Sequence, residues 1–130
     1  MTQYLAHIAL VVDDYDKAIE FYTQKLNFDL IEDTRLSGTK RWVLVAPKKS
    51  KECALLLAKA ANEDQTKAIG NQTGGRVFLF LSTDNVERDY NAMKEKGVEF
   101  VKEPSHEPYG TVAVFKDLYG NLWDLIEYNS

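Results

Sequence analysis

The chain has 130 residues, enough for one compact domain or for two small modules that share a core, because half of it would bury too little apolar surface to fold alone. Its net charge of −4 excludes the basic surface that nucleic acid requires, and it has neither an apolar run of about 20 residues nor a signal-like N-terminus. We therefore expect a cytoplasmic protein that binds neither nucleic acid nor membrane.

The first half of the chain, about residues 1–60, predicts a strand, a helix and three more strands. An apolar strand ends at Asp13 and Asp14, either of which can cap the helix that follows. Gly, Pro and Ser separate the later strands. The expected elements are a strand at 4–12, a helix at 14–26 and strands at 28–34, 40–46 and 52–58.

A connector at about 61–75 contains a possible short helix at 63–69 and ends in a glycine-rich turn. The second half, about residues 76–130, predicts the same order of elements as the first. The expected elements are a strand at 76–82, a helix at 85–96 and strands at 98–102, 110–116 and 122–128. Glu103 to Gly110, with two prolines, is expected to be a polar loop.

The two halves are versions of one pattern. A shift of 71 aligns the first strands and the helix caps, and a shift of 70 aligns Asn27 with Gly97 and the strands after them. The fold class is therefore α+β, with two tandem βαβββ modules in one domain of residues 1–130. Their sheets are expected to curl into a cup with the helices outside, and such a cup holds ligands.

With this repeat and the closing stretch Asp117-Leu-Tyr-Gly-Asn-Leu-Trp-Asp124-Leu, the chain resembles the vicinal oxygen chelate superfamily. That superfamily includes glyoxalase I, bleomycin-resistance proteins, fosfomycin-resistance proteins and extradiol dioxygenases. The stretch is similar to the superfamily's Asp-Pro-x-Gly-Asn-x-x-Glu-Leu ending, with Leu118 in place of Pro and Asp124 in place of Glu. The resemblance indicates the fold and leaves the reaction open.

Metal-using members of that superfamily place a His on the first strand and a Glu on the last strand of each module. These positions carry over to His7 and Asp124, while the other two fall on Ala54 and Phe78. Two ligands hold a divalent ion weakly. We therefore expect no cofactor and no tightly bound metal, and at most a weak divalent ion on His7 and Asp124.

His7 and Asp124 are the candidate catalytic residues. The resemblance implies that they lie in one cavity, where a carboxylate would orient the imidazole and raise its basicity as a general base requires. The alternative is a buried pair that only fixes the structure.

Five further residues are candidates for ligand binding. Arg41 and Thr111 share a repeat position, so both face the cup or both face away, and an inward Arg41 would bind an anionic ligand. Strand alternation places Trp42 on the face opposite Arg41, and Trp123 on the helix side. The remaining candidates are Tyr109, His106 and Phe78.

Three functions are open: a metal-free binder of a small organic molecule, an enzyme of the superfamily, or an interaction module whose cup is filled by Leu56, Phe78 and Phe80. The enzyme would be a lyase, isomerase, thiol transferase or dioxygenase that uses His7 and Asp124. A homodimer is expected because each module's sheet needs a partner, although the modules can also pair within one chain.

Overall fold

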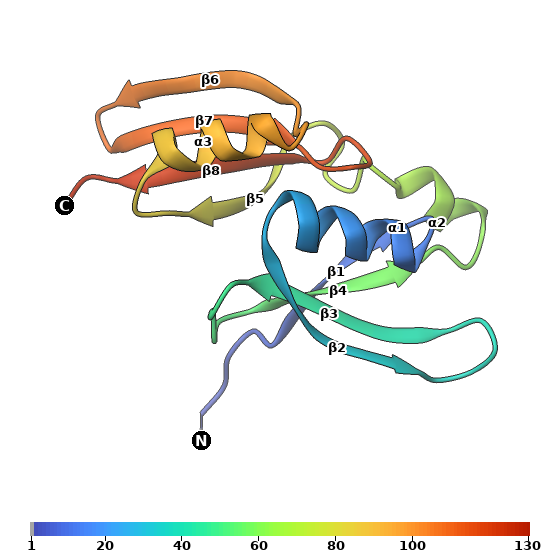
Figure 1. Cartoon of the computed structure of the whole chain (residues 1–130). Coiled ribbons are helices and arrows are strands. Elements are labelled where there is room, and N and C mark those ends of the chain that lie inside the picture. Colours follow the sequence, from blue (N-terminus) through green and yellow to red (C-terminus); the bar gives the residue numbers. More distant parts are fainter. Residues whose placement is uncertain (1) are drawn as a thin grey trace. The chain divides into compact units, whose positions relative to one another are not determined.

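The computed structural model describes residues 2–130, and the chain forms two compact units, Met1–Gly70 and Asn71–Ser130. The boundary falls inside the predicted connector. Each unit contains one four-stranded mixed sheet with a helix against one face (Figure 1). None of the helices in the described part of the chain is long and apolar enough to cross a membrane.

Unit 1 contains sheet A, whose strands lie in the order β1-β4-β3-β2. Strands β1 and β4 are parallel, and the other neighbours are antiparallel. Its elements are β1 (His7–Val12), α1 (Tyr15–Glu20), the π-helix η1 (Phe21–Lys25), β2 (Phe28–Arg35), β3 (Arg41–Pro47), β4 (Ala54–Lys59) and α2 (Glu63–Ala68).

Unit 2 contains sheet B, whose order β5-β8-β7-β6 repeats that of sheet A, with β5 and β8 parallel. Its elements are β5 (Val77–Ser82), α3 (Val86–Glu95), β6 (Phe100–Glu107), β7 (Gly110–Lys116) and β8 (Leu122–Tyr128). The α+β class and the two βαβββ modules predicted from the sequence are confirmed.

Equivalent residues begin and end the helix in each module. The side chain of Asp14 accepts a hydrogen bond from the backbone N–H of Lys17, and Asn85 accepts one from Arg88. These bonds satisfy backbone donors of the first helical turn. At the far ends, Asn27 has a φ of 63° and Gly97 a φ of 90°, the left-handed backbone that turns the chain back toward the sheet.

Two element predictions need correction. The helix predicted at 14–26 is an α-helix to Glu20 followed by the wider turn of η1. The loop predicted from Glu103 to Gly110 is largely strand, because β6 continues to Glu107 and β7 begins at Gly110. Register shifts between Phe100 and Ser105 accommodate Pro104, which cannot donate to a regular ladder.

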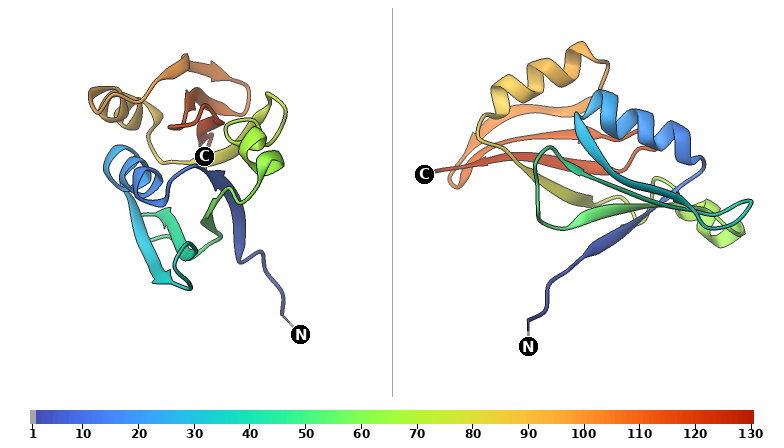
Figure 2. Two further views of the ribbon diagram at one scale, coloured as in Figure 1. Left: turned by 90° about the vertical axis from the view of Figure 1, so that its right-hand side faces the viewer. Right: turned by 60° about the horizontal axis from the view of Figure 1, so that its bottom comes forward.

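One face of each sheet packs on its own helix and forms the core. In unit 1, α1 and η1 bury Ala18 and Tyr22 as the strands bury Leu10, Val43 and Leu57. In unit 2, Tyr90 of α3 contacts Phe100, which contacts Phe115, and Trp123 stacks on Phe115 with ring centroids 5.7 Å apart. Trp123 therefore lies on the helix side, as predicted. Figure 2 shows α1 and α3 lying along their own sheets.

The two modules differ in how their parallel strands pair. In sheet A, His7 pairs with Ala54, so the aligned repeat would pair Phe78 with Asp124 in sheet B. The structure pairs Phe80 with Asp124, because β5 has an irregularity between Val77 and Leu79. The strand neighbour of Asp124 is therefore Phe80, two residues after Phe78, which is the repeat counterpart of His7.

Candidate functional site

Alternation along the strands of sheet A separates a helix face from an apolar second face. Arg41 and Val43 point to the helix face, while Trp42 and Leu44 point to the other. A buried cluster of Leu44, Ala46 and Ala54 lies on this second face, with Trp42 and Leu56 packed against it. We refer to this surface as the Trp42 face; its residues are His7, Ala9, Trp42, Leu44, Ala46, Ala54, Leu56 and Ala58.

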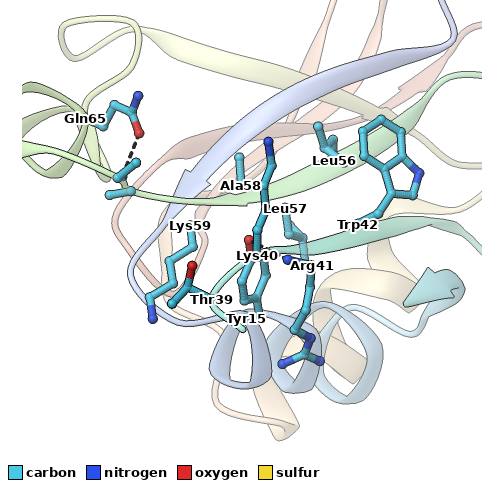
Figure 3. A pocket seen from close by; sticks show the side chains of 12 residues that line it. Tyr15, Thr39, Lys40, Arg41, Trp42, Leu56, Leu57, Ala58, Lys59 and Gln65 are labelled. Atoms are coloured by element: carbon cyan, nitrogen blue, oxygen red, sulfur yellow. Dashed lines mark hydrogen bonds between the residues drawn. The ribbon is translucent and has the colours of Figure 1, made fainter. Parts of the chain in front are cut away.

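A pocket of about 560 Å³ opens where β3 and β4 separate (Figure 3). The two strands pair only at Leu44 with Leu56 and at Val45 with Leu55. Beyond these pairs the strands diverge, and side chains from both faces line the gap. The lining residues are Tyr15, Thr39, Lys40, Arg41, Trp42, Leu56, Leu57, Ala58, Lys59, Ala60, Ala61 and Gln65.

Tyr15 of α1 occupies the helix side of this gap. It is buried, and its hydroxyl accepts a hydrogen bond of 3.1 Å from the backbone N–H of Arg41. The tyrosine thereby satisfies a backbone donor at the start of β3, where β4 has moved away. It fixes the edge of the pocket and closes it on the side of α1.

Arg41 lies on the helix face, where acidic groups hold its guanidinium. It makes two hydrogen bonds to Asp33, of 3.1 and 2.7 Å, and an ion pair of 3.0 Å with Asp16. Its guanidinium also lies 5.1 Å from the centre of the Tyr15 ring. The hydrogen bond from Arg41 lowers the pKa of Asp33. Arg41 lines the pocket, but its charge is balanced, and ligand binding by Arg41 stays a prediction.

His7 lies on the Trp42 face at the start of β1. Its ring meets the ring of Trp42 edge to face, with centroids 6.0 Å apart and an angle of 74° between the planes. The side chain is exposed, and Ala54 is its partner on the neighbouring strand. The imidazole is thus available to a molecule that lies against Trp42.

Asp124 lies in unit 2, on the face of sheet B opposite Trp123. Partial burial raises the pKa of its carboxyl group, and the charge of Lys102 opposes that shift. Its strand neighbours, Phe80 and Val114, are apolar. Because His7 and Asp124 belong to different units, the prediction that they share a cavity stays a prediction.

The other candidates lie elsewhere in unit 2. Thr111 has the parity of Ala113 and Phe115 and so lies on the helix face of sheet B, as its repeat counterpart Arg41 does in sheet A. The Thr111 hydroxyl is 3.0 Å from Nδ1 of His106 across β6 and β7. Tyr109 is half exposed in the turn between these strands, and Phe78 lies at the irregularity of β5. Their roles in ligand binding stay predictions.

The residues at the four metal-ligand positions of the superfamily do not fit a divalent ion, because only His7 and Asp124 have side chains that can bind one. Ala54 beside His7 and Phe80 beside Asp124 have no lone pair to offer. Among residues 2–130, no three His, Cys, Asp or Glu side chains come together as a metal site. The expectation of no tightly bound metal remains a prediction.

Sequence reasoning missed most of the pocket. It placed Trp42 and Arg41 on opposite faces correctly, but of its five proposed ligand-binding residues only Arg41 lines the pocket. The separation of β3 and β4, which opens the pocket, has no sequence signal of its own. The alternation Arg41-Trp42-Val43 was a signal that one face of this strand carries an aromatic side chain.

Comparisons with known proteins agree with this fold. The family model described as Glyoxalase/Bleomycin resistance protein/Dioxygenase superfamily matches residues 4–125. An uncharacterized protein of Shewanella frigidimarina is 59% identical over 99% of this chain and 96% of its own.

Two crystal structures are similar over nearly the whole chain. UcmS2 has a TM-score of 0.84 and 34% identity, with 97% of this chain and 98% of that one covered. TnmS3, an antibiotic binding protein from Streptomyces sp. CB03234, has a TM-score of 0.78 and 28% identity, with 98% of both chains covered. With the family model matching almost all of its length, the chain belongs to the Glyoxalase/Bleomycin resistance protein/Dioxygenase superfamily.

Proposed function

We propose that this protein binds a small organic molecule with a flat apolar part, and that the molecule lies against Trp42 in the pocket between β3 and β4. The observation that carries the proposal is the pocket itself. Its 560 Å³ falls within the roughly 300–1,000 Å³ that is common for ligand sites. Trp42, Leu56 and Ala58 provide an apolar wall on the Trp42 face.

The nature of the lining supports a binder of aromatic molecules. An indole ring offers a large flat surface at low entropic cost, and aliphatic side chains around it exclude water. The similarity to TnmS3, described as an antibiotic binding protein, supports the same kind of function for this chain.

A thermal-shift screen tests this proposal. A molecule that binds only the folded protein raises its melting temperature, so a panel of flat aromatic compounds is screened and hits are confirmed by calorimetry. We expect Leu56→Arg, which places a long charged side chain in the pocket, to abolish binding of the hits. The control is Leu118→Arg, at an exposed leucine of unit 2, which should leave binding unchanged. Equal binding by the wild type, Leu56→Arg and Leu118→Arg contradicts the proposal, and so does a screen without a hit.

A catalytic role for His7 is a second proposal, supported by its exposed imidazole beside Trp42. With Asp124 as its partner, the imidazole would act as a general base toward the bound molecule. Because His7 is exposed, we expect His7→Ala to weaken ligand binding or turnover and to change the free energy of unfolding by less than about 0.5 kcal/mol. A large loss of stability with unchanged ligand binding would favour a purely structural histidine.

We also propose that the protein forms a homodimer. Strands β1 and β5 lie at the edges of their sheets, and exposed edges favour association. Residues 2–6 precede β1 as an extended segment in which Tyr4 and Leu5 are 83% and 76% exposed. Such apolar side chains are typical of a surface that a second chain covers.

A further inference from the structure

The charged side chains that line the pocket are all basic. Of its twelve lining residues, three are Lys or Arg and none is Asp or Glu, although the whole chain has 20 acidic and 16 basic residues. A lining that has basic side chains and no carboxylate favours an anionic ligand. Lys40, Arg41 and Lys59 are the basic side chains that could bind such an anion.

Two of the three cations, Arg41 and Lys59, point to the helix side of the sheet. Arg41 is held by Asp33 and Asp16, as described above. Lys59 has the parity of Leu57 and points toward the helix side in Figure 3. The charge of Arg41 is therefore compensated, and both Arg41 and Lys59 point away from the Trp42 face.

Lys40 is positioned differently. Figure 3 shows its side chain pointing to the same side of the sheet as Leu56 and Ala58. Its backbone is fixed by the turn between β2 and β3, where its N–H donates to the Ser37 hydroxyl at 3.1 Å and its carbonyl accepts from Leu36 at 2.8 Å. Among the described residues the ion pairs include neither Lys40 nor Lys59, so Lys40 differs from Arg41 in having no carboxylate within ion-pair distance and from Lys59 in the side of the sheet to which it points. The neighbouring Thr39 adds a hydroxyl to the lining.

We propose, on the basis of the function proposed above, that the natural ligand carries an anionic group beside its flat apolar part, and that Lys40 binds this group. The apolar part lies against Trp42 and Leu56, and the carboxylate, sulfonate or phosphate lies at the Lys40 end of the pocket. Lys40 is then a specificity residue, while Trp42 supplies affinity that does not depend on charge.

Two fluorescent probes with the same ring system test this directly. Anilinonaphthalene sulfonate is anionic, and N-phenyl-naphthylamine is its neutral counterpart. We expect the wild-type protein to bind both and Trp42→Ala to weaken both. Lys40→Gln should weaken the sulfonate about fivefold, the scale of one exposed charge pair, and leave the neutral probe unchanged. The sulfonate affinity should also fall with added salt in the wild type and less so in Lys40→Gln.

The matched control is Lys59→Gln, which removes the same charge from the other side of the same pocket. We expect it to change sulfonate binding less than Lys40→Gln does. Equal effects of the two substitutions, or no effect of Lys40→Gln, overturn the role of Lys40 while the pocket remains a binding site. Failure of the wild type to bind either probe, or binding that Trp42→Ala leaves intact, overturns the proposed function as well.

Discussion

Asp117 holds the turn between β7 and β8 with both of its carboxylate oxygens. One oxygen accepts the backbone N–H groups of Tyr119 and Asn121, each at 2.9 Å, and the other accepts the Asn121 side-chain amide at 2.9 Å. Asp117 and Asn121 are both buried, so these donors have no water to replace the carboxylate. The turn places Asp124 on β8, and its residues carry the family ending recognised in the sequence.

We expect Asp117→Ala to lower the free energy of unfolding by about 2–4 kcal/mol, because it leaves two buried donors of Asn121 and the part-buried N–H of Tyr119 without their acceptor. Urea unfolding measures the change. The control, Glu95→Ala at an exposed position of α3, should change stability by less than about 0.5 kcal/mol. A loss from Asp117→Ala no larger than that of the control would show that the turn does not depend on these bonds.

The ionised carboxylate of Asp124 lowers the free energy of unfolding. Since its pKa in the folded protein is raised above the usual 3.8, ionisation of Asp124 destabilises the fold as the pH rises past 3.8. We therefore expect Asp124→Asn to be more stable than the wild type at about pH 7, with the gain becoming much smaller near pH 3.5, where the carboxyl is mostly protonated in both the folded and the unfolded state. Urea unfolding at the two pH values checks this, and a variant less stable than wild type at neutral pH contradicts it.

Most elements follow from residue patterns, and the exceptions have physical causes. Helix caps and apolar spacing are local, so Asp14, Asn85 and the stripe Val86, Tyr90 and Met93 are visible in the sequence. The extension of β6 past Pro104 is not local. It depends on hydrogen bonds from β7 and on irregularities that tolerate the missing N–H, neither of which the sequence displays.

Strand β7 begins at Gly110, where the chain approaches its neighbour closely. Gly110 pairs with Tyr128 of β8, and a Cβ atom at this position would collide with the backbone carbonyl of Glu127. We expect Gly110→Ala to destabilise the protein by about 2–3 kcal/mol, because rigid backbone cannot move aside as a side chain can. Thermal and urea unfolding measure the loss.

Gly38 provides the control for this substitution. It lies in the turn before β3, and a Cβ there has no heavy atom within 4 Å. Gly38→Ala should therefore be close to neutral. If Gly110→Ala were equally neutral, the close packing of β7 against the end of β8 would have to be looser than the structure shows.

At the scale of the whole molecule, the repeat predicts the order of elements but not the register in which the strands pair. Topology repeats from module to module, but pairing register does not, and so Phe80 rather than Phe78 lies beside Asp124. The pocket depends on the divergence of β3 from β4 and on the Tyr15 hydroxyl that replaces a strand partner. Such features arise from contacts between distant residues and leave no periodic pattern in the chain.

We predict that two chains associate as a homodimer. We expect light scattering at low micromolar concentration to give twice the chain mass of 14.8 kDa, because the edge strand β1 and the exposed Tyr4 and Leu5 favour a partner. Deletion of residues 1–6 should weaken the dimer. A mass of 14.8 kDa alone for the full-length chain would count against this expectation.

We propose that a small molecule binds against Trp42 in unit 1. The most direct test is a ¹H–¹⁵N NMR titration of the labelled protein with anilinonaphthalene sulfonate. We expect the largest shifts at the Trp42 indole N–H and at the amides of Leu56 and Ala58, which line the pocket. Shifts confined to unit 2, or a saturating titration that leaves the Trp42 indole unperturbed, would show that the molecule does not bind against Trp42.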